Sequence, residues 1–176
     1  MLVMVAAIAG GGCAPAFNWR DVRSIEHGFS VLLPARVASM TRTIDLDGQS
    51  VDMTLTGARA EQCLFSVGSA RLASDESSAR AHALASMQTA MLRNIGAQGL
   101  PAVRVITLER TDAAGAPAGR IEAVRVEAMG RLAGEPVVLQ AVFVGRGARI
   151  WQAVAITPPA LVEQGQTMLD AFRIID

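Results

Sequence analysis

The chain has 176 residues, enough for one domain with its own hydrophobic core. Its 16 basic residues are all Arg and balance 16 acidic residues, so the net charge at pH 7 is zero. A neutral chain has no cationic surplus to attract a phosphate backbone, and we expect no nucleic-acid partner. Tyr is absent and only two Trp are present, which argues against a carbohydrate-stacking surface.

The first twelve residues form an uncharged, apolar run that ends at a cysteine. Leu2 to Ala9 carry no charge, and three glycines lead into Cys13. The run is too short to cross a bilayer as a helix, which needs roughly 20 apolar residues. Its length is typical of the apolar core of a signal peptide followed by a small-residue processing site.

This segment resembles a bacterial lipoprotein signal, in which a cysteine after small residues becomes the lipid-bearing first residue of the mature chain. Gly10 stands where that family usually has a Leu-like residue, and no Arg or Lys precedes Cys13. The resemblance implies that acyl chains such as palmitate are attached to Cys13. Because Ala14 and not Asp follows, it also implies sorting to the outer membrane, facing the periplasm.

The chain thus divides into a signal peptide (1–12), a lipidated tether (13–24) and an α+β domain (25–176). A second processing site competes with the first, because Ala14-Pro15-Ala16 has the A-x-A pattern of ordinary signal peptidase cleavage. Cleavage there would release a soluble periplasmic protein that begins at Phe17. Both interpretations remain open from the sequence.

The first half of the domain shows strand patterns. A strand is expected at 29–33, and apolar and polar residues alternate over 43–46 and 51–56. Asp47-Gly48 between the last two favours a tight hairpin, because both residue types tolerate positive φ. A further strand is expected at 64–67.

The pattern then changes to a helical period. From about 76 to 95, apolar residues recur every three or four positions, which predicts an amphipathic helix. Ser74 or Asp75 can cap its start, and Gly96 can end it. Strand-like runs follow at 103–108, 121–129, 137–144 and 149–156.

A last helix is expected to begin with Thr157 as its cap and Pro158 in its first turn. The order of strands, helix, four strands and helix predicts an α+β fold: a single antiparallel β-sheet flanked by two main helices. We expect one domain without internal repeats.

Two short stretches carry a resemblance to known families. Asn18 to Val22, followed by Gly28-Phe29-Ser30-Val31-Leu32-Leu33-Pro34, resembles the opening of small proteobacterial lipoproteins of unknown role. The element order over 28–174, the strand from Gly28 to Pro34 and a closing helix near Phe172 are similar to the Mog1/PsbP-like fold. The resemblance implies a binding or assembly-accessory module, since this fold serves unrelated partners.

Candidate catalytic and metal-binding residues are few. His27 and His82 lack zinc-site spacing, so we expect no metal and no cofactor. Asp45, Asp47 and Asp52 surround one hairpin, where a solvated edge is favoured over a catalytic pair.

Other polar groups also favour structural interpretations. The serines have no nucleophile-elbow context, and the interleaved Arg and Glu residues favour cross-strand ion pairs on a wet sheet face. Cys63 lies in an apolar run and is expected to be a buried, inert thiol. The residues concerned are Ser66, Ser69 and Ser74, and Arg104, Arg110, Arg120 and Arg125 with Glu109, Glu122 and Glu127.

The sequence therefore predicts no enzyme and no catalytic residue. We expect a lipid-anchored, non-enzymatic binding or assembly-accessory module of the cell envelope, held to the membrane through Cys13 and contacting an envelope protein. Its contact surface is expected at the open edge of the sheet or near Phe17 and Trp19. The alternative is a periplasmic carrier of a small apolar ligand or lipid, held between the sheet and the helix at 76–95. An envelope hydrolase using Asp45 or Asp52 is a third hypothesis.

Overall fold

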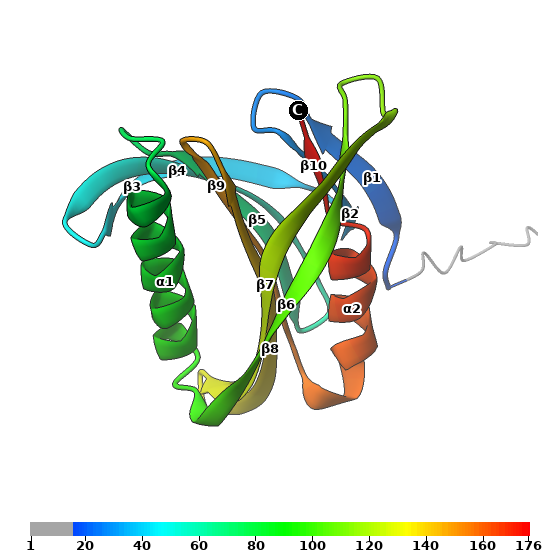
Figure 1. Ribbon diagram of the computed structural model, residues 1–176. Coiled ribbons are helices and arrows are strands. Elements are labelled where there is room, and N and C mark those ends of the chain that lie inside the picture. The colour runs from blue at the N-terminus through cyan, green and yellow to red at the C-terminus, as the bar shows by residue number, and fades with distance from the viewer. Residues whose placement is uncertain (1–15) are drawn as a thin grey trace, which may run out of the picture.

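A computed structural model describes residues 16–176 (Figure 1). The expected signal peptide (1–12) and the lipidation residue Cys13 lie outside the described residues. The strands are β1 (Trp19–Ser24), β2 (Phe29–Pro34), β3 (Ala38–Leu46), β4 (Gln49–Ala60), β5 (Cys63–Arg71), β6 (Gln98–Thr111), β7 (Pro117–Leu132), β8 (Glu135–Arg146), β9 (Arg149–Thr157) and β10 (Arg173–Ile175). The helices are α1 (Ser77–Asn94), the 3-10 turn η1 (Pro159–Leu161) and α2 (Val162–Asp170).

All ten strands belong to one sheet, in the order β1-β2-β10-β6-β7-β8-β9-β5-β4-β3. Neighbouring strands pair antiparallel except β10, which runs parallel to β6. The chain reaches this order through hairpins in each half, and the short β10 joins the β1-β2 hairpin to the rest. The sheet is therefore mixed.

The central strands β8 and β9 are buried on both faces. On β8, Leu139 and Ala141 lie in one hydrophobic cluster and Val142 and Val144 in the other. Successive side chains of a strand point to opposite faces, so both sides of the sheet are covered here. This explains why β8 and β9 are nearly continuous apolar runs in the sequence.

Helix α1 covers one face. It packs Ala83 and Met87 against this face. Gly96 follows its end with φ of +52°, and the N–H groups of Gly96 and Ala97 donate to the carbonyls of Arg93 and Leu92. These two bonds form a Schellman motif, so the predicted end at Gly96 is confirmed.

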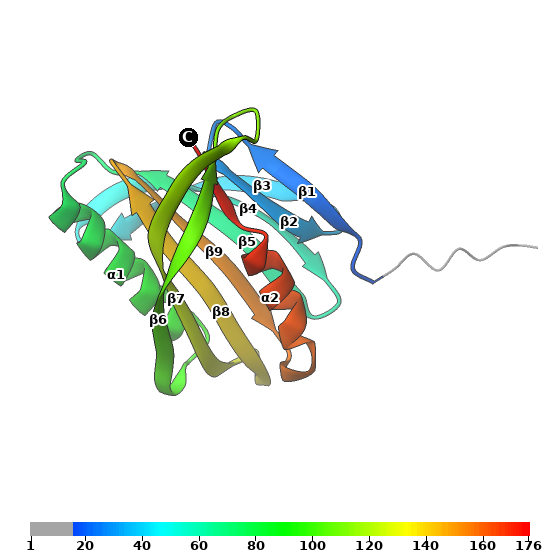
Figure 2. The same cartoon turned by 45° about the vertical axis from the view of Figure 1, so that its right-hand side comes forward.

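The opposite face is covered by α2 and by the sheet itself. Figure 1 shows α1 and α2 on opposite sides of the central strands, and Figure 2 shows the β1-β2 hairpin alongside α2. The sheet curls, so β2 contacts β4 and β5. The rings of Phe17 and Trp19 stack 6.1 Å apart, and both meet Phe65 of β5 edge-on, at 6.4 and 5.5 Å. The curl thus buries apolar surface that no helix covers.

The expected fold class, an antiparallel sheet flanked by two main helices, is wrong. The sheet is larger and mixed, and its helices are short, with 18 residues in α1 and nine in α2. Periodicity identifies strands but not their neighbours, so it could not show that β10 pairs parallel to β6. It also gave no sign that the curled sheet covers much of its own face.

Several boundaries also differ from those expected. Part of the stretch assigned to a tether, Trp19–Ser24, is β1 and pairs with β2. The helix predicted to start at Thr157 is delayed, because β9 continues through Thr157 and η1 precedes α2. Ser74 does not cap α1 in the expected way: its Oγ accepts from the N–H of Glu76, which occupies the cap position itself.

The hairpin between β3 and β4 is confirmed. Asp47 and Gly48 have φ of +56° and +79°, the positive values that a two-residue hairpin of this type requires at both positions. The carboxylate of Asp45 accepts a hydrogen bond from the N–H of Gly48, at 3.0 Å. None of the described helices is both long and apolar enough to cross a membrane.

We expect Phe172→Ala to lower the free energy of unfolding by about 3–5 kcal/mol, because the Phe172 ring is fully buried and its removal leaves a cavity beneath α2. Urea unfolding followed by circular dichroism measures the loss. Gln166→Ala, at an exposed position of α2 itself, is the control and should change stability by less than about 0.5 kcal/mol. Equal effects of the two substitutions would contradict this packing of α2.

Candidate functional site

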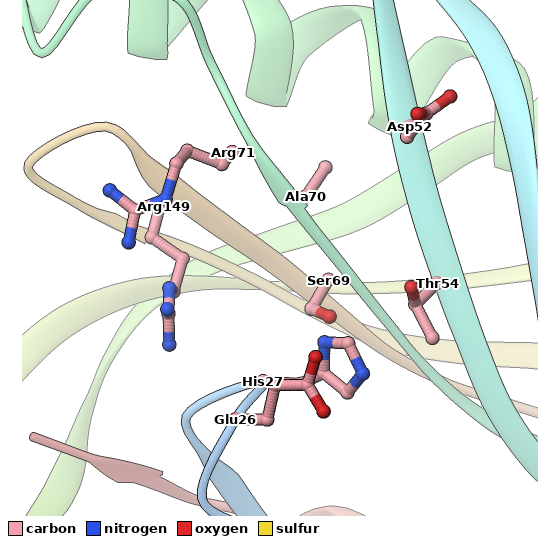
Figure 3. A pocket seen from close by; sticks show the side chains of 8 residues that line it. All are labelled: Glu26, His27, Asp52, Thr54, Ser69, Ala70, Arg71 and Arg149. Atoms are coloured by element: carbon pink, nitrogen blue, oxygen red, sulfur yellow. The ribbon is translucent and has the colours of Figure 1, made fainter.

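A polar pocket lies where the turn between β1 and β2 approaches β4, β5 and the start of β9. Its volume is about 290 Å³, near the lower end of the range for ligand sites. In Figure 3, Arg71 and Arg149 lie at one end and Asp52 and Thr54 at the other. The Arg71–Arg149 pocket, as we call it, is lined by Glu26, His27, Asp52, Thr54, Ser69, Ala70, Arg71 and Arg149.

The two arginines at one end repel each other. Arg71 of β5 and Arg149 of β9 are directly opposite in the antiparallel ladder. Like charges in this position are destabilising. Burial lowers the pKa of Arg149, and the positive charge of Arg71 lowers it further. Within residues 16–176, neither guanidinium forms an ion pair with a carboxylate.

Ser69 adds an unsatisfied hydroxyl to the same pocket. The residue is only 5% exposed, and its Oγ has no hydrogen-bond partner among the described residues. A buried polar group without a partner costs about 1–3 kcal/mol. Ser69 is two positions before Arg71 on β5, so both side chains emerge on the same face. In Figure 3 the Ser69 side chain points toward the wall formed by His27.

Two hydrogen bonds hold the turn that closes the pocket. The indole N–H of Trp151 donates to the carbonyl of His27 at 2.7 Å, and the N–H of Ile175 donates to that of Gly28 at 3.0 Å. Gly28 has φ of +68°, and a Cβ there would lie 2.6 Å from Nη1 of Arg149. The Arg149 side chain could move away from such a Cβ, but the positive φ and the Ile175 carbonyl oxygen, 3.1 Å from the same position, favour glycine here.

The pocket offers the chemistry of an anion site. Two guanidiniums supply positive charge and planar donor arrays that suit carboxylate or phosphate oxygens. The Ser69 hydroxyl and the His27 imidazole can add hydrogen bonds. At the other end, the Asp52 carboxylate already accepts a 2.6 Å bond from the Thr43 hydroxyl.

A second hollow lies along the open edge strand β3 and has a volume of about 780 Å³. Most of its lining surface is apolar, with three arginines among the residues that line it. We call it the edge groove. It is lined by Ala35, Arg36, Ala38, Ser39, Met40, Arg42, Leu55, Gly57, Ala58, Arg59, Leu64, Phe65 and Ser66.

A third hollow of about 490 Å³ adjoins the Arg71–Arg149 pocket and shares both of its arginines. There the Asp176 carboxylate accepts hydrogen bonds from Arg110 and Arg146. None of the three hollows is lined by a residue of α1, the helix under which the carrier hypothesis places its ligand.

The other predicted polar groups fall in several places. Asp45 and Asp52 are both exposed and bond to their own hairpin. His82 is exposed on α1, far along the chain from His27. Within residues 16–176, no three His, Cys, Asp or Glu side chains are grouped so that they could hold a metal ion.

Ion pairs were expected among the Arg and Glu residues of 104–127, and several form. Arg104 pairs with Glu127 at 3.4 Å, and Arg120 with Glu109 at 2.8 Å. Arg125 differs from the expectation of a wet face, because its side chain is only 7% exposed. It pairs with Glu127 at 3.0 Å and with Asp170 of α2 at 3.5 Å, and so joins the helix to the sheet.

The sequence did not identify Arg71 and Arg149 as site residues, and it dismissed Ser69. The two arginines are nearly 80 positions apart, and only the pairing register of β5 with β9 brings them together. Arg71 ends one apolar run and Arg149 begins another. Opposed charges at the ends of these two strands could be recognised only if the pairing of β5 with β9 were already known.

No protein-family model matches the sequence, and no curated protein is similar to it in sequence. Among solved structures, it is similar to cyanobacterial PsbP (CyanoP) from Synechocystis sp. PCC 6803, with 14% identity and a TM-score of 0.48 over 93% of this chain and 96% of the other. A Pseudomonas aeruginosa protein of unknown function is similar with 14% identity and a TM-score of 0.32, over 84% and 88%. Both similarities concern the fold alone.

Cys63 is buried, with 2% of its surface exposed, as its apolar surroundings predicted. Burial raises the pKa of its thiol, and the nearby Glu61 carboxylate raises it further. In a Cys13→Ser chain, we expect Cys63 to resist a disulfide reagent at pH 8 in the native state and to react fully in urea.

The raised pKa of the Cys63 thiol also makes the free energy of unfolding depend on pH. The native state holds the Cys63 proton more tightly than the unfolded chain, so the free energy of unfolding should fall as pH rises above about 8.5. Cys63→Ala should show a smaller fall over the same range. Rapid labelling of the native thiol would contradict this assignment.

Proposed function

We propose that this chain is a non-enzymatic binding module of the bacterial cell envelope, anchored through acyl chains on Cys13, which holds a small anionic ligand in the Arg71–Arg149 pocket. Its partner in the envelope is a protein that receives or presents this ligand. The outer membrane, facing the periplasm, is the proposed location.

The unpaired arginines carry the ligand part of the proposal. Two opposed guanidiniums and an unsatisfied hydroxyl raise the free energy of the empty pocket, and one anion would relieve both defects together. Ser69 and His27 line the pocket without a hydrogen bond between them, whereas a nucleophile and its base are normally within hydrogen-bond reach. The arrangement therefore favours binding over hydrolysis.

The start of the folded domain is compatible with an anchor on Cys13. Trp19 pairs with Pro34, and the carbonyl of Asn18 accepts from the N–H of Ala35. Processing before Cys13 or after Ala16 keeps Phe17, whose ring stacks on Trp19. Both candidate cleavage sites thus leave the β1-β2 hairpin complete, and an anchor on Cys13 would hold the domain close to the membrane.

Acylation is tested by the mass of the mature N-terminus and by membrane partitioning. We expect a diacylated or triacylated Cys13 in the membrane fraction, and release of Cys13→Ala into the soluble fraction, because single acyl chains bind membranes only marginally and stable anchoring needs two signals. A mature chain that begins at Phe17, and partitions independently of the substitution, would make this a released periplasmic protein.

Anion binding is tested by thermal unfolding in the presence of inorganic phosphate and, separately, acetate. A ligand that binds only the native state stabilises it, by about 2.7 kcal/mol at a concentration 100 times its Kd. We expect at least one probe to raise the Tm of the natural chain, and Arg149→Gln to abolish the increase.

The same variants have a second signature without ligand. Arg149→Gln removes a like-charge repulsion and Ser69→Ala removes an unsatisfied hydroxyl, so neither should lower the stability of the empty protein, and Arg149→Gln should raise it by about 0.2–1 kcal/mol. Arg20→Gln, at an exposed position of β1, is the control and should leave the ligand-induced increase intact. Destabilisation of the empty protein by both variants would show that these groups are structural.

A further inference from the structure

The edge groove combines an apolar stripe with cationic ends. Met40 and Leu55 are directly opposite across β3 and β4, and Leu64 is opposite Arg59 across β4 and β5. Opposed residues share a face, and alternate residues along a strand do too, so Met40, Leu55 and Leu64 line one face. Met40 is 48% exposed, and the two leucines are half-buried.

This stripe continues the face that α1 covers. Met53, two positions before Leu55 on β4, is buried in the same cluster as Met87 of α1. Leu55 and Leu64 pack only against the margin of that cluster. Beyond the helix, the apolar face therefore extends to the open edge of the sheet, where it forms part of the groove.

Arginines stand at both ends of the stripe. Arg42 is opposite Met53, and Arg59 lies six residues further along β4 on the same face. At about 3.3 Å per residue, their attachment points are roughly 20 Å apart. A third arginine, Arg36, lines the groove where β2 leads into β3.

These three arginines form no ion pair within residues 16–176. All three are exposed, and no carboxylate lines the groove. Exposed guanidiniums around an apolar floor are complementary to a molecule with an anionic head and an apolar tail.

The groove also lies beside the entry of the chain. Ala35, which lines it, is hydrogen-bonded to Asn18 at 3.1 Å. Asn18 is five positions after Cys13, a reach of at most about 18 Å. With the acyl anchor of the proposed function, on which this step rests, the groove would lie within reach of lipid headgroups.

We infer that the edge groove binds an anionic phospholipid of the membrane to which the protein is attached. The phosphate is held by the guanidiniums of Arg36 and Arg59 at one end of the groove, and part of an acyl chain lies along Met40, Leu55 and Leu64. Arg42, at the other end, faces the headgroup of a neighbouring anionic lipid. The site is separate from the Arg71–Arg149 pocket, which takes a small soluble anion.

Flotation with vesicles tests this inference on the mature chain, residues 13–176, carrying Cys13→Ser, which has neither an acyl anchor nor the apolar segment 1–12. The probes are vesicles of equal parts phosphatidylcholine and phosphatidylglycerol, and vesicles of phosphatidylcholine alone. We expect binding to the anionic vesicles only, and weakening by added salt because exposed charges are screened.

Arg42→Gln with Arg59→Gln should weaken binding by about 30-fold, since each basic residue near an anionic surface contributes about 1 kcal/mol. Met40→Gln should weaken it without a change in charge. The matched control, Arg93→Gln with Arg104→Gln, removes the same charge from α1 and β6 and should bind as the natural sequence does. All these positions are exposed, so the variants should fold.

Four results would overturn the inference: no binding to the anionic vesicles, equal binding to both kinds of vesicle, equal weakening by the control pair, or full competition by soluble glycerol phosphate, which would make the ligand a free phosphate. If the protein does not float with vesicles but captures an envelope protein at the groove, the groove is a site for a protein partner, and the inference is again overturned. Failure of Cys13 acylation is measured separately and leaves this outcome unaffected.

Discussion

The whole arrangement depends on the need to cover both faces of β8 and β9. Most of their residues are buried, and the central ones on both faces, so apolar layers must lie on each side of the sheet. Helix α1 supplies one layer. The short α2 is too small to supply the other alone, and the sheet completes it by curling until β2 contacts β4 and β5. This curl also carries the Glu26-His27 turn over the ends of β5 and β9, and thereby creates the Arg71–Arg149 pocket. The Arg71–Arg149 pocket is thus a consequence of how the core is closed.

The pocket gathers groups that would be unfavourable together in an ordinary core. Opposed arginines and a buried, unpartnered hydroxyl each oppose folding by an amount similar to the net contribution of one hydrogen bond. The turn beside them is held in place, because Trp151 and Ile175 bind it at His27 and Gly28 from two different strands. This wall of the pocket is therefore already ordered before an anion binds, which lowers the ordering entropy that opposes binding.

Local chemistry predicted the local features well. The Asp47-Gly48 turn, the end of the first helix at Gly96 and the burial of Cys63 all follow from one or a few neighbouring residues. The sheet's order could not be predicted, since the three-residue β10 gives no periodic signal and pairs with strands more than 60 positions away. The six residues of β1 also show no regular alternation, so this segment was expected to be a tether, although its partner β2 follows directly. The pocket was missed because its residues become neighbours only through strand register and curl.

Both proposed sites are built on the hairpin of β4 and β5. Thr54 and Ser69 are opposite each other and line the Arg71–Arg149 pocket, whereas Leu55 and Leu64 belong to the opposite face and line the edge groove. From the Thr54–Ser69 pair to the Arg59–Leu64 pair the ladder runs five residues without a register shift, about 17 Å. A hydrogen-bonded ladder in the body of a sheet does not change length, so the two sites keep a fixed separation. A lipid bound in the groove would therefore set the height and orientation of the anion pocket above the membrane, which a flexible acyl tether alone cannot do.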